Sequence, residues 1–204
     1  MIRAFVLPSI AVLALAACGQ PDDPAEAPAP ETPAAAEAPA QTSDSNALSA
    51  QGWGPLRIGM TREEVVTALG EDANPNAVGG PDPEACDQFR PEQAPENMLV
   101  MLEQGVLTRI SVADGSDLET DRGFGVGDSA ADIKAAYGDD AQVSPHKYVD
   151  APAEYITVWT DGPSDEPYRE DADARGVVYE IGDDGNVSMI HVGGPSIQYV
   201  EGCS

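Results

Sequence analysis

Few residues of this chain could act as nucleophiles, general bases or metal ligands in a recognisable pattern. Neither His146 nor His191 lies near a cysteine in the sequence. HExxH, GxSxG, a glycine-rich phosphate loop and a CxxC pair do not occur. We therefore expect no catalytic residues and no enzymatic activity, with both histidines structural or solvent-facing. The alternative is a catalytic thiol that the fold brings beside a histidine.

Acidic side chains crowd two expected loops and could offer calcium the hard oxygen ligands that it prefers. The first loop contains Asp114, Asp117, Glu119 and Asp121, and the second spans residues 161–166. Neither follows the Asp-x-Asp-x-Asp-Gly register of an EF-hand. We expect solvated acidic loops and no cofactor, with calcium at the first loop as the alternative.

The charge balance excludes one class of partner. The chain holds 36 acidic and 10 basic residues, a formal net charge of −26. Such a chain is repelled by nucleic-acid phosphates and by anionic lipid. We expect no nucleic-acid partner, and any membrane attachment must be covalent or hydrophobic.

The first residues have the pattern of a signal peptide. Arg3 precedes an apolar run that is shorter than the roughly 20 residues of a membrane span but fits a signal-peptide core. The run ends in Leu15-Ala16-Ala17-Cys18, which resembles the lipobox of bacterial lipoproteins. The resemblance implies that residues 1–17 are removed and that Cys18 carries acyl chains such as palmitate. Gly19, in place of an Asp, favours the outer membrane, facing the periplasm; a plain secretory signal with a chance cysteine is the alternative.

Residues 18–50 have the composition of a tether. They are rich in Ala, Pro and Glu and contain no aromatic residue, so they cannot bury enough apolar surface to order themselves. We expect a disordered, semi-extended spacer between the bilayer and a folded module that begins at Gln51. A proline-rich recognition segment is the alternative.

With Cys18 assigned to acylation, Cys86 and Cys203 remain. An even number of thiols in an oxidising periplasm favours a disulfide. It would close a loop of over a hundred residues, which contributes about 4–5 kcal/mol in the chain-entropy model.

The module contains an internal repeat. Residues 56–70 are matched, 68 residues later, by residues 124–138. The matched positions are those that begin, bury and end a short helix. They are the N-caps Thr61 and Ser129, the capping-box acids Glu64 and Asp132, the apolar pairs Val65/Leu69 and Ile133/Tyr137, and the terminal glycines Gly70 and Gly138.

Strand patterns follow each predicted helix. The first unit has segments 86–89, 98–102 and 106–112, and the second has 155–159, 176–181 and 187–192, with a last short strand at 197–200. We expect an α+β fold of two tandem repeats, at 51–121 and 122–204, each a short helix packed on an antiparallel β-meander.

The helix pattern of Gly59 to Gly70 resembles that of two families of small bacterial envelope proteins. These are the SmpA/OmlA (BamE) outer-membrane assembly lipoproteins and the beta-lactamase inhibitory protein, BLIP, which is itself a tandem of helix-plus-sheet units. The resemblance implies a BLIP-like fold over about residues 52–200. It transfers no functional residue.

Taken together, the sequence predicts a membrane-anchored envelope lipoprotein that acts as a non-enzymatic module binding an unknown envelope protein. Tyr155, Trp159 and Tyr179 could share one sheet face and form the binding surface. The alternative is a periplasmic lipoprotein that binds a small molecule or calcium.

Overall fold

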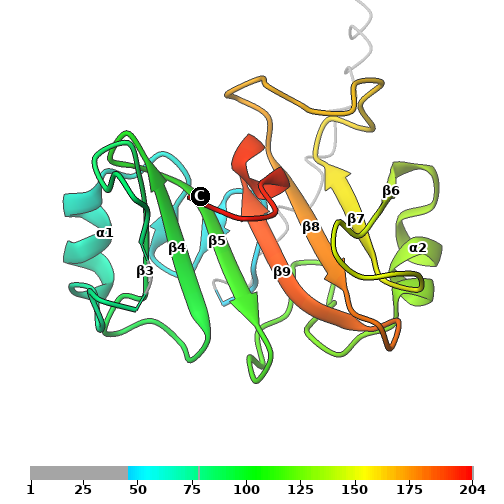
Figure 1. Ribbon diagram of the computed structural model, residues 1–204, viewed down its shortest axis with the longest axis horizontal. Helices are drawn as coiled ribbons and strands as arrows, with labels where there is room; N and C mark the ends of the chain where they lie inside the picture. The colour runs from blue at the N-terminus through cyan, green and yellow to red at the C-terminus, as the bar shows by residue number, and fades with distance from the viewer. Residues whose placement is uncertain (1–45, 78, 204) are drawn as a thin grey trace, which may run out of the picture. The chain divides into compact units, whose positions relative to one another are not determined.

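The structure, a computed structural model, describes residues 46–77 and 79–203 (Figure 1). The predicted signal peptide, Cys18 and the tether up to residue 45 lie outside the described residues. In chain order the elements are β1 (Gly52–Trp53), β2 (Leu56–Arg57), α1 (Arg62–Leu69), β3 (Cys86–Phe89), β4 (Met98–Glu103), β5 (Val106–Ala113), α2 (Ala130–Tyr137), η1 (Gly138–Asp140), β6 (Gln142–Pro145), β7 (Glu154–Trp159), β8 (Gly176–Ile181), β9 (Val187–Gly193) and η2 (Pro195–Gln198).

A seven-stranded antiparallel sheet organises this part of the chain. Its strand order is β3–β4–β5–β9–β8–β7–β6 (Figure 1). The meander β3–β4–β5 therefore meets the meander β6 to β9 along the pair β5–β9, where Ser111 lies opposite His191. The predicted α+β class, with antiparallel strands and two helices, is confirmed.

The six internal strands predicted from the sequence are present, but the last one is not. Residues predicted as a strand at 197–200 instead form the end of η2 and the turn after it. Both edges of β9 are already paired, with β5 and β8, so a strand that follows β9 finds no free partner there. Pro195 begins η2 because its fixed φ suits a helical start and it has no N–H to offer a ladder.

The two helices begin as the sequence predicts, with one difference. At α1 the Thr61 hydroxyl accepts from the Glu64 amide at 3.3 Å and the Glu64 carboxylate accepts from the Thr61 amide at 2.8 Å, a complete capping box. At α2 the Ser129 hydroxyl accepts from the Ala131 and Asp132 amides. Among the described contacts the Asp132 carboxylate makes no return bond, in keeping with its shorter side chain.

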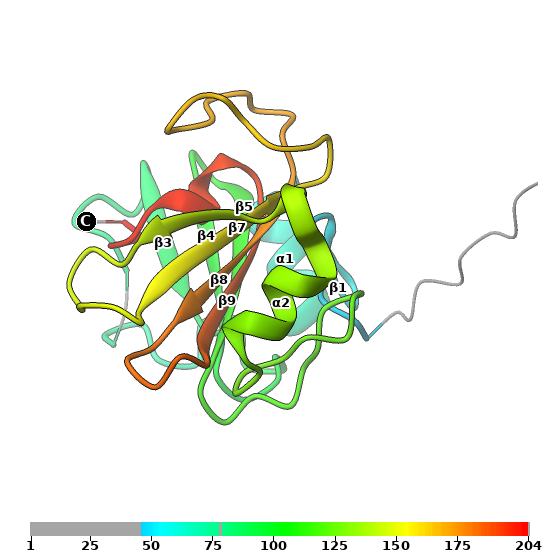
Figure 2. The ribbon, with the colours of Figure 1, turned by 90° about the vertical axis from the view of Figure 1, so that its right-hand side faces the viewer.

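Each face of the sheet has a different cover. Both helices pack on one face, and the C-terminal segment crosses the other, so in the side view the sheet lies between them (Figure 2). The helix-covered face holds the main hydrophobic core, which includes Val65 of α1, Ile133 of α2 and the fully buried Tyr179 of β8. The Tyr179 hydroxyl donates to Thr120 Oγ1 at 3.1 Å.

The C-terminal segment 194–203, which we call the strap, covers the second face. The predicted disulfide is confirmed: Cys203 at the end of the strap is bonded to Cys86 at the start of β3, with their Cα atoms 5.4 Å apart. The strap is thereby fixed at the β3 edge of the sheet after it has crossed β5.

The folded module begins earlier than predicted. Leu48 and Ala50, assigned from sequence to the tether, are buried in the core, and the Leu48 amide donates to Glu119 O at 2.9 Å. The boundary at Gln51 is therefore a few residues late. Among the described residues, no helix has the length and apolar character needed to cross a membrane.

Candidate functional site

A row of polar side chains lies on the strap-covered face of the three central strands. Successive strand residues point to opposite faces, so Arg109 and Ser111 of β5 project toward the strap while the alternating Ile110 and Val112 enter the core. His191 of β9 and Glu180 of β8 project from the same face. Arg109, Ser111 and His191 are all buried, at 3%, 4% and 6% exposure, so they form the polar floor beneath the strap.

Ser111, His191, Glu180 and His146 form a continuous chain of polar contacts. Ser111 Oγ lies 2.8 Å from His191 Nδ1, His191 Nε2 lies 3.7 Å from Glu180 Oε2, and His146 Nε2 lies 3.1 Å from Glu180 Oε1. Two backbone amides of the following loop donate to His146 Nδ1, each at 3.2 Å. His146 therefore carries its proton on Nε2 and donates it to Glu180.

The charge states in this chain follow from burial and neighbours. The contact with His191, and then that with His146, holds the pKa of Glu180 below its ordinary value against the opposing effect of burial. Burial lowers the pKa of His191, and the nearby Arg109 guanidinium lowers it further, although Glu180 acts in the opposite direction. At neutral pH His191 is accordingly uncharged and Glu180 is a carboxylate.

The order serine, histidine, carboxylate has the composition of a catalytic triad, but the surroundings do not suit nucleophilic catalysis. Ser111 sits in the middle of β5, whose amides are committed to ladders with β4 and β9. Stabilising an oxyanion requires free donors beside the nucleophile. The chain of contacts therefore fits a structural and electrostatic role better than acyl transfer.

Arg109 ties the strap to the sheet. Its Nη1 donates to the Ser196 and Tyr199 carbonyls at 3.1 and 2.8 Å, and its Nη2 donates to Gln88 Oε1 at 2.9 Å. Burial lowers the pKa of Arg109 to about 10, while Glu103 and Glu180 oppose that shift. The guanidinium is thus charged at neutral pH and holds the strap with charge-assisted hydrogen bonds.

A cavity of about 190 Å³ opens beside Glu180. Glu180 and His191 line it from the sheet, and Tyr155, Tyr168 and Tyr199 contribute aromatic walls from β7, the loop after β7 and the strap. Tyr168 and Tyr199 are 54% and 38% exposed, so they form its rim. A second hollow, of about 280 Å³, also contains Glu180 and His191, and Val200 of the strap lines both. The carboxylate is therefore shared by two openings beside the strap.

Tyr155 presents a polar atom to this region that the protein does not satisfy. Its ring stacks on His146 at 4.7 Å between centroids, and its hydroxyl oxygen is buried with no hydrogen-bond partner among the described residues. Burial, followed by the Glu180 charge, raises the Tyr155 pKa; the Lys147 backbone amide opposes the shift without reaching hydrogen-bond geometry. The phenol thus stays neutral and can both donate and accept.

The aromatic residues predicted to share one binding face do not do so. Tyr155 and Trp159 lie on the strap-covered face, whereas Tyr179 is fully buried on the helix-covered face. Trp159 is 4% exposed, and the Arg169 guanidinium covers its ring at 5.1 Å. Of the three, only Tyr155 reaches the cavity.

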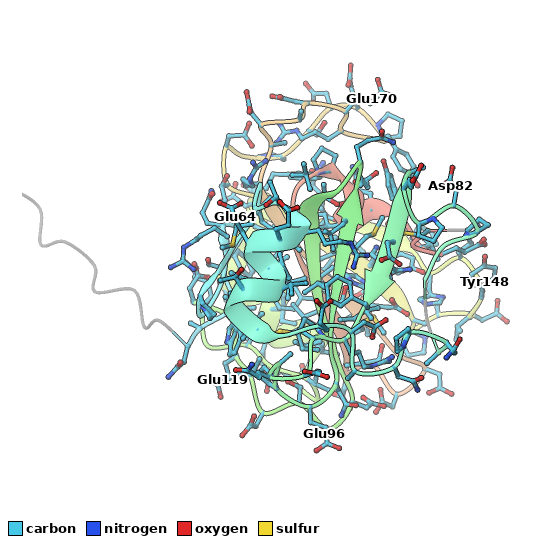
Figure 3. All side chains as sticks on the ribbon, turned by 90° about the vertical axis from the view of Figure 1, so that its left-hand side faces the viewer. Glu64, Asp82, Glu96, Glu119, Tyr148 and Glu170 are labelled. Atoms are coloured by element: carbon cyan, nitrogen blue, oxygen red, sulfur yellow. A yellow bond between two sulfur atoms is a disulfide. The ribbon has the colours of Figure 1, made fainter. Side chains whose placement is uncertain are left out.

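The acidic residues considered for calcium are exposed and stay dispersed. Asp114, Asp117, Glu119 and Asp121 all lie at the surface. Within residues 46–77 and 79–203, no group of three or more His, Cys, Asp or Glu side chains could hold a metal ion. In the second acidic loop, Asp161 pairs with Arg169. Many other carboxylates, Glu96 and Glu119 among them, project outward from the surface (Figure 3).

Comparison with protein-family models, curated proteins and solved structures found no match. The site therefore has to be interpreted from its own geometry. Sequence reasoning singled out Tyr155 for a binding surface, took His146 and His191 as structural or solvent-facing, and missed Arg109, Ser111 and Glu180. The sequence does contain a pattern that could have pointed to these three residues. Each is a polar residue that alternates with apolar residues in a predicted strand.

Proposed function

We propose that this chain is a membrane-anchored envelope lipoprotein whose folded module binds a partner protein on the strap-covered face, without enzymatic activity. The observation that carries the proposal is the tyrosine-rimmed cavity over the Glu180 carboxylate. Tyrosines are enriched where protein interfaces concentrate their binding energy, because one rigid ring buries a large area and its hydroxyl finds a polar partner. Tyr168 and Tyr199 are exposed beside such a cavity.

The size of the cavity favours a protein over a free ligand. Sites for drug-sized molecules enclose about 300–1,000 Å³, whereas this cavity holds about 190 Å³. That volume suits a single side chain inserted from a larger surface. Tyr148, which is 62% exposed and contacts Glu201 of the strap, extends the aromatic surface beyond the rim.

The proposal includes a duplicated fold of the BLIP and SmpA/OmlA type. In its support, α1 precedes the meander β3–β4–β5, and α2 precedes the meander β7–β8–β9. The two helices start 68 residues apart, after Thr61 and Ser129, and each is followed by a glycine with positive φ, Gly70 and Gly138. The edges β5 and β9 then join the two units into one sheet.

The proposed anchor is a set of acyl chains on Cys18, with the remaining residues up to about 45 as spacer and the outer membrane, facing the periplasm, as the location. A Cys18→Ser variant tests this part. It is expected to move from the membrane fraction to the soluble fraction while keeping the unfolding profile of the module. Continued membrane association of that variant would contradict acyl anchoring.

Position-specific photo-cross-linking in intact cells tests the docking face. A photoreactive phenylalanine analogue is placed at Tyr168 or Tyr199, and in a control at Glu63, which is exposed on α1 on the opposite side of the sheet (Figure 2). The same adduct is expected at both rim positions and not at Glu63. Absence of an adduct at the rim, or an identical adduct at all three positions, contradicts the proposed face.

A further inference from the structure

Glu180 combines three properties that point to the chemistry of the group that enters the cavity. Its side chain is 25% exposed, it lines both hollows, and the polar contacts around it stabilise its ionised form. Tyrosine side chains line the same cavity, and the faces of aromatic rings attract cations.

The lining of the cavity includes one cation, Lys147, and one carboxylate, Glu180. Arg109 lines the second hollow, Glu103 acts on Arg109, and Glu201 pairs with Lys147 from outside this cavity. Lys147 Nζ is paired with Glu201 at 2.9 Å, and the Arg109 donors described above are engaged with the strap and Gln88. Neither cation therefore neutralises Glu180 by direct contact.

The hydrogen-bonding capacity of the site favours a compact donor. An ionised carboxylate has about four acceptor positions, and His146 donates to one oxygen of Glu180 while His191 lies at the other. A guanidinium fork needs both oxygens in one plane, which these histidines obstruct. An ammonium needs only one free position, and Tyr155 Oη supplies a second, unsatisfied acceptor.

We propose that the cavity binds the primary ammonium of a lysine side chain presented by the partner protein, between Glu180 and Tyr155 and beneath Tyr168 and Tyr199. This inference rests on the proposed docking function. The lysine stem would lie along the tyrosine rings, and its charge would meet the Glu180 carboxylate on the cavity floor.

Titration of the full chain with tripeptides tests the inference. The probes are acetyl-Gly-Lys-Gly-amide, its norleucine analogue as the neutral isostere, and its arginine analogue. Methyl NMR signals of Val178, Ile197 and Val200, which line the cavity, report occupancy. The lysine peptide is expected to bind about tenfold or more tightly than the other two; equal or stronger binding of either analogue overturns the proposal.

Two variants measure separately how much each acceptor contributes to binding the lysine peptide. Glu180→Gln removes the charge, and Tyr155→Phe removes only the hydroxyl; each is expected to weaken the lysine peptide about tenfold. Glu170→Gln, an equal charge change at an exposed loop residue (Figure 3), is the matched control and should leave binding unchanged. If Glu180→Gln fails to fold, binding of the lysine peptide to Tyr155→Phe still tests the site. Unchanged binding in the folded acceptor variants overturns the site.

Three combinations of the binding and cross-linking results distinguish a failure of this inference from a failure of the docking function. If n-butylammonium binds and the lysine peptide does not, the cavity binds free amines. The inference that its occupant is a lysine side chain of a protein is then wrong. If the rim positions cross-link a partner while no ammonium binds, docking stands without this inference. If the lysine peptide binds but the rim captures no partner, the ammonium site exists and the docking function fails.

Discussion

Ser111 and His191 face each other across the pair β5–β9, with Ser111 Oγ 2.8 Å from His191 Nδ1. The two residues are 80 positions apart in the chain, and their contact lies where one meander meets the other. Because His191 is buried and uncharged, this contact gives one of its ring nitrogens a hydrogen-bond partner inside the protein. The pair therefore joins the two meanders through polar side chains as well as through the ladder.

Ser111 is expected to be chemically unreactive. A fluorophosphonate probe, which labels activated serines, should not modify the folded chain, because Ser111 is buried and the surrounding amides are engaged in the sheet. Intact-mass spectrometry measures this, with a known serine hydrolase as positive control. Stoichiometric labelling that Ser111→Ala abolishes would show instead that the site is catalytic.

Stability should fall as the solution is acidified from neutral pH. The pKa of His191 is lowered in the fold, so the unfolded state binds more protons once the pH drops below about 6.5. The pKa of Glu180 is also lowered; its contribution is complete above its unfolded pKa of about 4.5 and is lost as the pH falls through the folded pKa. Urea unfolding from pH 7 to pH 4 measures the trend. In the His191→Gln variant, the free energy of unfolding should depend less on pH in the part of the range nearest pH 7. Parallel pH profiles of the variant and the parent chain would contradict the assignment of this dependence to His191.

Removing the disulfide should destabilise the module strongly. The bond joins residues 117 positions apart, and in the chain-entropy model a loop of that length contributes about 4–5 kcal/mol. Urea unfolding of the Cys86→Ser/Cys203→Ser double variant measures the loss. Adding a thiol reductant should destabilise the parent chain by a similar amount and leave the double variant unchanged. A loss below about 1 kcal/mol would mean that the strap is held by its other contacts.

Gly193 is expected to tolerate no side chain. It has φ +144°, and a Cβ there would lie 2.2 Å from Thr108 O at the junction of β9 and β5. Gly193→Ala should therefore cost more than about 3 kcal/mol in unfolding free energy. Gly127, with φ +93° and open space around it, is the matched control, and its alanine variant should cost about 1–2 kcal/mol from φ alone. Equal losses at both positions would contradict the steric argument.

Local features could be predicted from the sequence. The N-caps Thr61 and Ser129 were identifiable because a cap needs only residues within four positions. The turn between β4 and β5 is also local, with Gln104 and Gly105 at positive φ, as a two-residue hairpin turn requires. The disulfide followed from cysteine counting and the expected oxidising compartment.

The binding face could not be predicted because strand register is not local. Tyr179 lies opposite Ile156 in the β7–β8 pair, and this register puts it on the opposite face from Tyr155 and Trp159. Sixteen residues separate these two strands, so no turn signal sets their alignment. Likewise, the contacts of Glu180 with His146 and His191 exist only once four strands have assembled.

The strap has a consequence for the order in which the fold is completed. Tyr199, Val200 and Cys203 follow every strand of the sheet in the sequence, yet the first two complete the cavity and Cys203 is bonded to Cys86 at the start of β3. A chain cut before Tyr199 lacks part of the cavity lining. The covalent closure also waits for an environment that oxidises thiols. The covalently closed form of the cavity is thus reached only after every strand of the sheet has been made and both thiols have been oxidised.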